Sequence, residues 1–281
     1  MTHNLSPIIK PQELLVLKQT TPFVLVDARS GAKEKYASNH LEGAFHVDLN
    51  TDLADIKPDA ADGGRHPLPN FAHFNQVLSD LGITPNSHVV IYDDKNGANA
   101  AARFWWMLKS IGHEAVQVLD GGMDAAIDAG YPLSNQAPKR LVSDNYQANE
   151  WQLPTSDIAE MDKATQNAQC LIIDVREEGR YNGEFEPLDL IAGHIPNAVN
   201  IPFSSNLDEN GFFLPPLELR EKYEAALNER VSEQVIVHCG SGVTACHTLL
   251  AMAYAGLEVP KLYVGSWSEW SRNGRPMITK A

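Results

Sequence analysis

Cys239 has the clearest capacity for chemistry of any residue in the sequence. It follows an apolar segment, Val235–His238, and precedes a loop of small residues, Gly240–Thr244. The apolar segment predicts a buried strand, and the run from Thr244 to Ala255 predicts a helix. The backbone N–H groups of such a loop and the N-terminus of the helix favour an anion, so they would stabilise the thiolate form of the cysteine. The pattern therefore predicts a nucleophilic cysteine at the end of a strand.

Each residue of the loop after the cysteine has an expected part in this site. Gly240 and Gly242 permit unusual backbone angles, which would let several amides converge on one point. Ser241 can donate a hydrogen bond to an anion on the cysteine or on a substrate, and Thr244 is a candidate helix cap. With Val243, these residues form the expected substrate-binding loop. The alternative is that the cysteine is only a small buried hydrophobe, but the strand end and the glycine loop coincide at this position.

Two other cysteine chemistries fit the sequence poorly. A cysteine phosphatase requires an arginine six positions after the cysteine, where this chain has Ala245. A zinc site could use His238, Cys239, Cys246 and His247, but two of these end a predicted strand and two lie in a predicted helix, which is not a recognised ligand spacing. We therefore expect no metal at this site.

An acyl-transfer enzyme is a third alternative, and it would need a base close to the cysteine. His66 and His194 are the candidates for that base. The spacing of residues along the chain does not decide whether either histidine lies near Cys239.

The chain contains a long internal repeat. An apolar segment ending in an acid occurs at residues 23–29 and again at residues 171–176. A second apolar segment then ends at Asp93 in the first copy and at Cys239 in the second, after almost equal lengths of chain. Because these β-branched segments alternate with helical ones, they predict a parallel sheet flanked by helices in each copy.

The repeat predicts an α/β protein of two tandem domains. We expect an N-terminal domain at residues 1–140, a linker at 141–156 and a C-terminal domain at 157–281. Ligands of parallel α/β sheets bind at the carboxyl ends of the strands. At that position the first copy has Asp93 and the second has Cys239, so we expect the first domain to be catalytically silent and the second to hold the active site.

Composition excludes several other classes of function. The 281 residues are 43% hydrophobic and carry a formal net charge of −14, which disfavours nucleic acid or an anionic membrane as the partner. No apolar run approaches the ~18 residues of a membrane span, and the N-terminus does not resemble a secretory signal. Three cysteines are too few and too scattered for a disulfide framework. The expected location is the cytoplasm.

A family resemblance rests on several of these segments together. The loop Cys239–Cys246 resembles the active-site loop of the two-domain rhodanese family, in particular its 3-mercaptopyruvate sulfurtransferase branch. The turn His194–Pro196, the pair Trp105 and Trp106, and the segment Gly265–Trp270 are similar to that family as well. The resemblance implies a sulfurtransferase without metal or organic cofactor, in which Cys239 accepts sulfur from a small donor as a persulfide. The acceptor would be cyanide or a thiol such as that of thioredoxin.

The resemblance also implies roles for residues outside the loop. In the mercaptopyruvate branch a serine acts with a histidine and an aspartate, which match Ser241, His66 and Asp48 here; Asn50 matches the aspartate position equally well. Arg180 matches an arginine that binds the donor's carboxylate. A second arginine of the branch falls near Leu188, which leaves the donor open.

Two alternatives therefore remain beside mercaptopyruvate transfer. Thiosulfate could be the donor, although the thiosulfate branch has cationic residues just after the cysteine, where this chain has Gly240 and Ser241. The protein could also be a relay module that accepts one persulfide and hands it on without turnover.

We expect a structural role for residues that recur in both copies or lie within predicted strands and helices: His40, His194, Asp27, Asp174, Cys170 and Cys246. Trp267 and Trp270 could either line the pocket or pack at the interface between the two expected domains.

Overall fold

The computed structural model describes residues 5–29, 31, 33–139 and 146–279. The chain divides into two compact units, each built from three segments. Unit 1 comprises Met1–Ala54, Pro69–Gln152 and Glu209–Phe212. Unit 2 comprises Asp55–Leu68, Leu153–Asp208 and Phe213–Ala281.

The units differ from the two consecutive domains that the sequence predicts, because each unit includes one short segment from the other half of the chain. Residues 55–68 belong to unit 2, and residues 209–212 belong to unit 1. Hydrogen bonds from its backbone to side chains of α10 hold the first of these segments in unit 2, because Gly63 N donates to Glu269 Oε1 and Arg65 N donates to Ser268 Oγ.

The expected linker, 141–156, divides into three parts. Its residues 141–145 lie outside the described residues. Residues 146–152 belong to unit 1 and residues 153–156 to unit 2.

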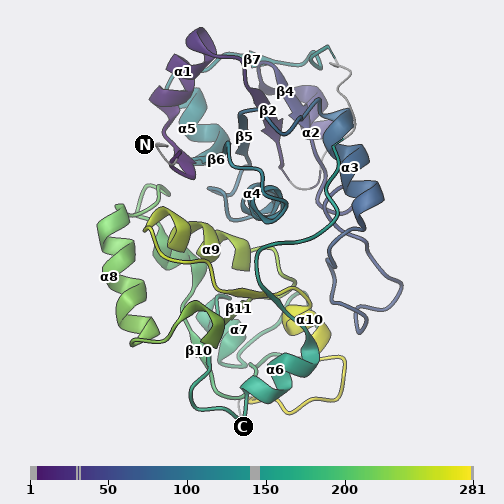
Figure 1. Cartoon of the computed structure of the whole chain (residues 1–281), viewed down its shortest axis with the longest axis vertical. Helices are drawn as coiled ribbons and strands as arrows, with labels where there is room; N and C mark the ends of the chain where they lie inside the picture. Colours follow the sequence, from purple (N-terminus) through teal and green to yellow (C-terminus); the bar gives the residue numbers. More distant parts are fainter. Residues whose placement is uncertain (1–4, 30, 32, 140–145, 280–281) are drawn as a thin grey trace. The chain divides into compact units, whose positions relative to one another are not determined.

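Unit 1 contains a parallel sheet, a short antiparallel strand pair and several helices (Figure 1). The strands are β1 (Ile8–Ile9), β2 (Val24–Asp27), β3 (His40–Leu41), β4 (Ala44–His46), β5 (Val89–Tyr92), β6 (Val116–Leu119) and β7 (Leu133–Ser134). The helices are α1 (Pro11–Thr20), α2 (Lys33–Ser38), α3 (Phe71–Asp80), α4 (Ala100–Ser110) and α5 (Gly122–Asp128).

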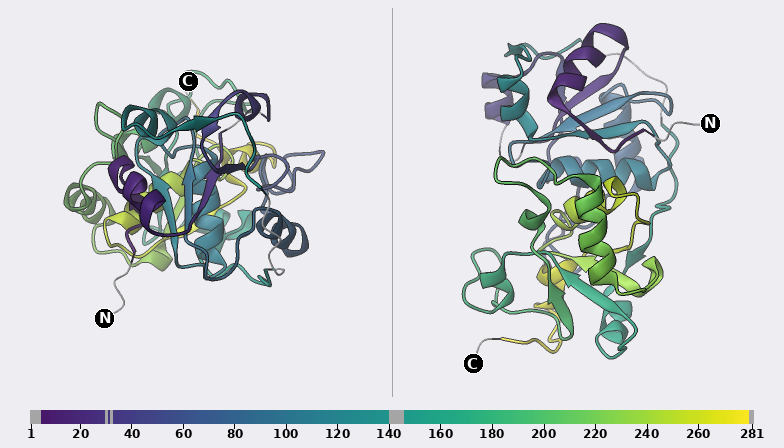
Figure 2. Two further views of the ribbon diagram at one scale, coloured as in Figure 1. Left: turned by 90° about the horizontal axis from the view of Figure 1, so that it is seen from above. Right: turned by 90° about the vertical axis from the view of Figure 1, so that its left-hand side faces the viewer.

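Unit 2 also contains a five-stranded parallel sheet and several helices, and Figure 2 gives two further views of the ribbon. The strands are β8 (Thr155–Ser156), β9 (Leu171–Asp174), β10 (Ala198–Asn200), β11 (Val235–His238) and β12 (Lys261–Tyr263). The α-helices are α6 (Ile158–Ala164), α7 (Glu178–Tyr181), α8 (Pro216–Leu227), α9 (Ala245–Tyr254) and α10 (Ser266–Trp270). Two 3-10 helices, Phe203–Asn206 and Ser232–Gln234, complete the elements that the structure describes.

The two parallel sheets have the same strand order. In unit 1 the order is β1-β6-β5-β2-β4, and in unit 2 it is β8-β12-β11-β9-β10. The register is also the same: Asp27 pairs with Tyr92, the residue before Asp93, and Asp174 pairs with His238, the residue before Cys239. The predicted α/β fold with an internal repeat is therefore confirmed, and Asp93 and Cys239 occupy equivalent places.

Both faces of each sheet are buried. In unit 1, Leu25, Val90 and Leu119 pack in one cluster with Leu14 of α1 and Met123 of α5. The alternate residues of the same strands, Val26, Ile91 and Val118, are fully buried as well. Since neighbouring side chains of a strand point to opposite faces, helices must cover both.

Unit 2 is built in the same way, and its core includes two tryptophans of α10. Ile172, Ile236 and Tyr263 pack in one cluster with Trp267 and Trp270. Both indole rings are fully buried, and their N–H groups donate to backbone carbonyls of residues 191 and 276. These tryptophans are therefore core residues of unit 2.

The acids that end equivalent strands have equivalent ion pairs. Arg29 binds Asp27 in unit 1, and Arg176 binds Asp174 in unit 2. Each arginine also donates to a backbone carbonyl at the turn that follows, that of Asn39 or Gly193. These contacts tie the strand end to the next turn, which is the structural role expected for both acids.

The two turn histidines are equivalent as well. His40 stacks on Tyr36 with 4.0 Å between ring centroids and contacts the Tyr36 carbonyl through Nδ1 at 2.7 Å. His194 stacks on Tyr181 at 3.8 Å and contacts the Tyr181 carbonyl at 2.8 Å. Their expected structural role agrees with this geometry.

No helix in the described residues is both long and apolar enough to cross a membrane.

Candidate active site

Cys239 directly follows the last residue of β11, and the loop after it leads into α9. The cysteine is only 1% exposed. Its backbone N–H donates to Ser266 Oγ over 3.2 Å, and its carbonyl accepts from Trp267 N over 3.1 Å. The start of α10 therefore holds the cysteine backbone on both sides.

The two glycines of the loop serve different purposes. Gly242 has φ +72°, and a β-carbon there would lie 2.5 Å from the Val264 carbonyl oxygen. Only glycine fits this conformation and this space. Gly240 does not have a positive φ, so our expectation of an unusual backbone angle there is wrong. A β-carbon on Gly240 would instead lie 3.0 Å from Arg65 Nη2 and 3.3 Å from Arg180 Nη2, so this glycine leaves space for two guanidinium groups.

Thr244 takes the N-cap position of α9 but does not cap it with its side chain. Its backbone is helical, with φ −68° and ψ −18°, and no side-chain cap hydrogen bond forms. A capping side chain requires extended backbone geometry at the N-cap. The expected cap is therefore absent at Thr244.

His66 lies beside the loop. Its Nδ1 is 2.8 Å from Ser241 Oγ, and Ser241 is buried, with 6% exposed. The sequence alone did not bring these two residues together, because they lie 175 positions apart. Both belong to unit 2, since the segment Asp55–Leu68 is part of that unit.

Close backbone packing positions the segment that contains His66. Gly64 has φ +84°, and a β-carbon there would lie 2.4 Å from the Gly265 carbonyl oxygen. Arg65 N donates to Ser268 Oγ over 3.0 Å, and Gly63 N donates to Glu269 Oε1 over 3.1 Å. Burial raises the pKa of Glu269, although the N–H of Gly63 acts in the opposite direction. Because of these contacts, the backbone immediately before His66 packs against the N-terminal turn of α10.

Arg180 lies on α7 and is 7% exposed. Its Nε and Nη2 donate to the two oxygens of Glu186 over 3.1 and 2.8 Å. Burial alone would lower the pKa of Arg180, but its bonds with Glu186 outweigh that effect and raise it. Burial acts to raise the pKa of Glu186, yet Arg180 and two backbone N–H groups lower it overall. Both groups are therefore charged at neutral pH.

Leu188 does not contribute to a cationic site. Its side chain is 58% exposed, and its backbone N–H donates to Glu186 Oε1 over 3.0 Å. The loop around it instead contributes Asp189, whose fully buried side chain contacts both Arg65 and Arg272. Sequence analysis assigned no role to these three residues. A usable signal was the position of Arg65 directly before His66.

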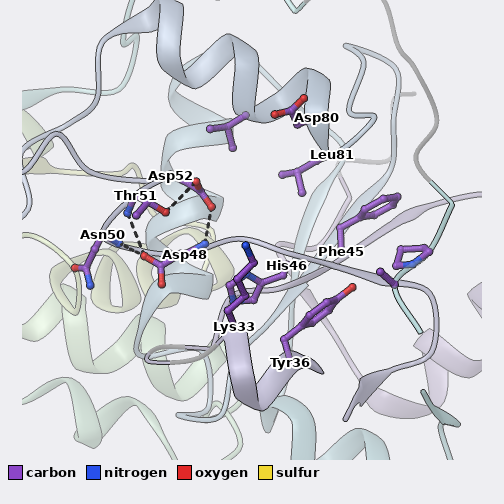
Figure 3. Close-up of a pocket in the computed structure, with 13 residues that line it drawn as sticks. Lys33, Tyr36, Phe45, His46, Asp48, Asn50, Thr51, Asp52, Asp80 and Leu81 are labelled. Carbon is purple, nitrogen blue, oxygen red and sulfur yellow. Dashed lines mark hydrogen bonds between the residues drawn. The ribbon is translucent and has the colours of Figure 1, made fainter. Parts of the chain in front are cut away.

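Asp48 belongs to unit 1 and forms hydrogen bonds within its own turn (Figure 3). Its Oδ1 accepts from the backbone N–H groups of Asn50 and Thr51 over 2.8 and 3.1 Å, and its own N–H donates to Asp52. Asp48 and Asn50 both line a cavity of about 680 Å³ in this unit, together with Tyr36. The structure thus gives Asp48 a local role in shaping a turn.

Asp93 of unit 1 shows how many backbone N–H groups a strand-end loop of this kind directs at one side chain, although burial still raises the pKa of this carboxyl group. Its Oδ1 accepts from the backbone N–H groups of Lys95 and Gly97, both over 2.9 Å. Its Oδ2 accepts from those of Asn99 and Ala101, over 3.1 and 3.2 Å. One fully buried carboxylate therefore receives four backbone hydrogen bonds at the place equivalent to Cys239.

The described residues include no group of three or more His, Cys, Asp or Glu side chains arranged to hold a metal ion. The cysteines also remain separate, since Cys170, Cys239 and Cys246 are all free. Cys246 is fully buried, and its Sγ donates to the Gly242 carbonyl over 3.3 Å, which agrees with a structural role.

Comparisons with known proteins agree with this fold. The Rhodanese-like domain family matches the chain twice, at residues 10–129 and 157–273. The chain is 40% identical over 284 residues to a probable 3-mercaptopyruvate sulfurtransferase of Pseudomonas aeruginosa, covering 98% of this chain and 96% of the relative. It is 34% identical over 252 residues to thiosulfate sulfurtransferase of Rattus norvegicus, covering 87% and 82%.

A solved structure supports the same conclusion. The 3-mercaptopyruvate sulfurtransferase from Leishmania major superposes with a TM-score of 0.83 and 29% identity, covering 98% of this chain and 76% of that one. Two family matches that span most of the chain, and relatives similar along nearly its whole length, identify both repeats. The chain belongs to the rhodanese-like family, with two domains of that type, and it is a sulfurtransferase.

Proposed function

We propose that this sulfurtransferase takes its sulfur from 3-mercaptopyruvate and passes it, through a persulfide on Cys239, to cyanide or a thiol. The observation that carries this proposal is the 2.8 Å contact between Ser241 Oγ and His66 Nδ1. It lies in a loop that has no cationic side chain directly after the cysteine. A neutral loop with an activated hydroxyl suits a donor that requires proton transfer.

The first step forms the persulfide. The Cys239 thiolate attacks the sulfur of the donor thiol, an S–S bond forms, and the donor's C–S bond breaks. The electron pair of that bond stays on carbon as the enolate of pyruvate. The proton of the donor thiol ends on the same carbon, which leaves pyruvate and the persulfide anion. Ser241 and His66 move this proton.

The loop at Asp93 supports the proposal that backbone N–H groups surround the position of Cys239. The carboxylate at the equivalent place in unit 1 receives four backbone hydrogen bonds. A persulfide extends from Cys239 by one sulfur and carries a single negative charge, so the loop that begins at Gly240 can bind its outer sulfur in the same way. The persulfide therefore needs no metal for its stabilisation.

Arg180 binds the donor's carboxylate in this proposal. Its Nη2 would lie 3.3 Å from a β-carbon on Gly240, the residue that follows Cys239. A charge-assisted hydrogen bond to a carboxylate contributes about 1.5–3 kcal/mol. Asp48 is the proposed third member of the Ser241–His66 pair. Replacing Asp48 with asparagine tests this. If the carboxylate is catalytic, the kcat of the variant falls; if Asp48 only shapes the turn, the stability of the variant falls and its kcat does not.

The second step regenerates the cysteine. The acceptor, cyanide or a thiolate, attacks the outer sulfur, and the S–S bond breaks with its electron pair returning to Cys239 Sγ. The products are thiocyanate or a new persulfide and the free Cys239 thiolate. Thioredoxin is one thiol of this class.

Thiosulfate is the second candidate donor. The observation in its favour is that two guanidinium groups, those of Arg65 and Arg180, lie against Gly240, where they attract a dianion. Its transfer releases sulfite and moves no proton, so it does not use the Ser241–His66 pair.

The deciding experiment compares the two donors directly. Thiocyanate formation from cyanide is measured with 3-mercaptopyruvate and with thiosulfate, with Cys239→Ser as the blank. A kcat/KM at least about tenfold higher for mercaptopyruvate, equivalent to 1.4 kcal/mol, supports the proposal. A preference for thiosulfate overturns the donor assignment. Loading of Cys239 without turnover on either donor supports a relay module instead.

A further inference from the structure

We propose that unit 1 contains a second ligand site, a cavity that binds a free α-amino acid with an apolar side chain. The cavity has a volume of about 680 Å³, and all of its lining residues belong to unit 1. The loop after Cys239 belongs to unit 2, so the cavity shares no residue with that loop. The inference goes beyond the proposed function and is independent of the sulfur donor.

The cavity lies where β4 ends (Figure 3). His46 is the last residue of β4, and residues 48–52 form the turn that follows it. Helix α2 contributes Lys33 and Tyr36 to the lining, and α3 contributes Val77. Ligands of parallel α/β sheets bind at the carboxyl ends of strands, and ligand pockets have volumes of roughly 300–1,000 Å³. Both the place and the size of this cavity are therefore those of a ligand site.

His46 directs an available nitrogen at this cavity. Its Nε2 is buried and has no hydrogen-bond partner among the described residues. The neighbouring His40 is different, because both of its ring nitrogens contact backbone carbonyls, those of Tyr36 and Gln136. Buried polar groups are nearly always hydrogen-bonded. Since His46 lines the cavity, a ligand there is the partner that its Nε2 can bind.

Charged side chains of both signs line the cavity. Lys33 has no carboxylate partner in the described part of the chain, whereas Lys35 of the same helix pairs with Asp94. The turn contributes the carboxylates of Asp48 and Asp52. Oδ1 of Asp48 accepts from two backbone N–H groups of the turn, and its Oδ2 accepts from no described residue. A cation and an anion are therefore both available to a ligand.

The rest of the lining is largely apolar. Phe45, Val77 and Leu81 contribute to it, and the last two are buried. Tyr36 presents its ring, because its hydroxyl donates to the Ala44 carbonyl over 2.7 Å. Burial and the charge of a nearby acid raise the pKa of Tyr36 to about 12, so this side chain is neutral. These residues form an apolar wall for a hydrocarbon group.

The three kinds of lining fit the three parts of an apolar amino acid. Its carboxylate binds Lys33 and the N–H of His46 Nε2. Its ammonium group binds the carboxylates of Asp48 and Asp52. Its side chain packs on the apolar wall. An acid without the ammonium group is repelled by the two aspartates, and an amine without the carboxylate leaves Lys33 unpaired.

The test measures binding and not sulfur transfer. L-Leucine, L-methionine and L-phenylalanine are titrated into the full-length wild type by calorimetry. The tightest of the three is then compared with two matched analogues, the amine that lacks its carboxylate and the 2-oxo acid that lacks its ammonium group. The same titrations are made with Lys33→Gln, His46→Phe and Asp52→Asn.

Two further variants serve as controls. Lys35→Gln is the matched one, because Lys35 also lies on α2 but pairs with Asp94 and does not line the cavity. Arg180→Ala reveals whether the amino acid binds at the proposed donor site instead. Thermal melts verify folding, and Lys33→Gln alone decides the test if a variant at His46 or Asp52 does not fold, because Lys33 is exposed.

We expect the amino acid to bind at least about tenfold more tightly than either analogue. Lys33→Gln, His46→Phe and Asp52→Asn should each weaken its binding about 10-fold or more, whereas Lys35→Gln and Arg180→Ala should change it less than about twofold. The proposal is overturned if none of the three amino acids binds with a Kd below about 10 mM. Equal binding of an analogue, unchanged binding in Lys33→Gln, or loss of binding in Arg180→Ala alone would overturn it as well.

Discussion

Ser241 Oγ lies 2.8 Å from Nδ1 of His66, although the two residues are 175 positions apart in the chain. The contact exists because the segment Asp55–Leu68 packs on the start of α10, where Gly64 approaches the Gly265 carbonyl too closely for any side chain. A serine hydroxyl in contact with an imidazole can donate or accept a proton during a reaction. This relationship is the basis of the first prediction.

His66→Gln and Ser241→Ala should each lower kcat for 3-mercaptopyruvate about 10²- to 10⁴-fold, the usual contribution of general acid–base catalysis. The double variant should be little worse than either single one, because the two residues act as a pair. Thiosulfate turnover should fall much less, since that donor releases sulfite without a proton transfer. Steady-state kinetics of all three variants with both donors provide the measurement. Losses that multiply in the double variant would show that the residues act separately.

Cys239→Ser should abolish sulfur transfer and leave the fold intact, because the hydroxyl is a far weaker nucleophile than the thiolate. Cys246→Ser is the matched control. It is also buried in unit 2, and a serine hydroxyl can still donate to the Gly242 carbonyl. Thiocyanate formation and a thermal melt of both variants give the answer. Activity in Cys239→Ser, or its loss in Cys246→Ser, would contradict the assignment of the nucleophile.

Arg180→Ala should raise KM for mercaptopyruvate more than for thiosulfate, with a loss in kcat/KM of about 10- to 100-fold. It should also lower stability, because Glu186 is left with fewer partners: Arg176 and two backbone N–H groups remain. Donor kinetics and denaturant unfolding separate the two effects. Equal kinetic losses with both donors would argue against a carboxylate-binding role.

Gly242→Ala should destabilise unit 2 by roughly 1–3 kcal/mol or more and impair sulfur transfer. The reason is twofold: φ is +72°, and the new methyl group would lie 2.5 Å from the Val264 carbonyl oxygen. Gly274→Ala is the control, because Gly274 also has a positive φ, +62°, but nothing within 4 Å of its β-position. Unfolding of the two variants in denaturant isolates the steric part. Equal destabilisation by both would mean that the close approach at Gly242 is unimportant.

Stability should decline as the pH falls below about 6.5, the ordinary pKa of histidine. Burial lowers the pKa of His113 in unit 1 and of His238 in unit 2; Asp174 counteracts this at His238 without reversing it. The unfolded chain therefore binds more protons than the folded one below that pH. The two buried neutral histidines therefore contribute fully to the free energy of unfolding above about pH 6.5, and this contribution is lost as the pH falls toward their folded-state pKa values.

Denaturant unfolding between pH 7.5 and 5.5 measures this dependence. His113→Gln should make the free energy of unfolding depend less steeply on pH. The His113 ring lies in unit 1, where it contacts the Ser87 carbonyl and Tyr146. His73→Gln on α3 serves as the control, since that histidine lies near the surface. An unchanged slope in His113→Gln would contradict the burial argument.

Local sequence patterns determined a large part of this protein. Short apolar segments such as Val235–His238 predict buried parallel strands, and the same order of segments occurs twice. The repeated α/β fold could therefore be predicted from the pattern. The position of Cys239 at a strand end followed as well, because the glycine-rich loop and helix come directly after it. These features depend on neighbours along the chain, which the sequence displays.

Only the tertiary structure decided which distant residues surround the cysteine. Arg65 and Asp189 are 124 positions apart and meet beside Gly240, while the segment that contains His66 belongs to unit 2 and not to the first domain expected from its place in the chain. Such contacts depend on how loops pack on an already formed sheet. The periodicity of strands and helices predicts which residues are buried, but it does not predict which distant loop packs against them.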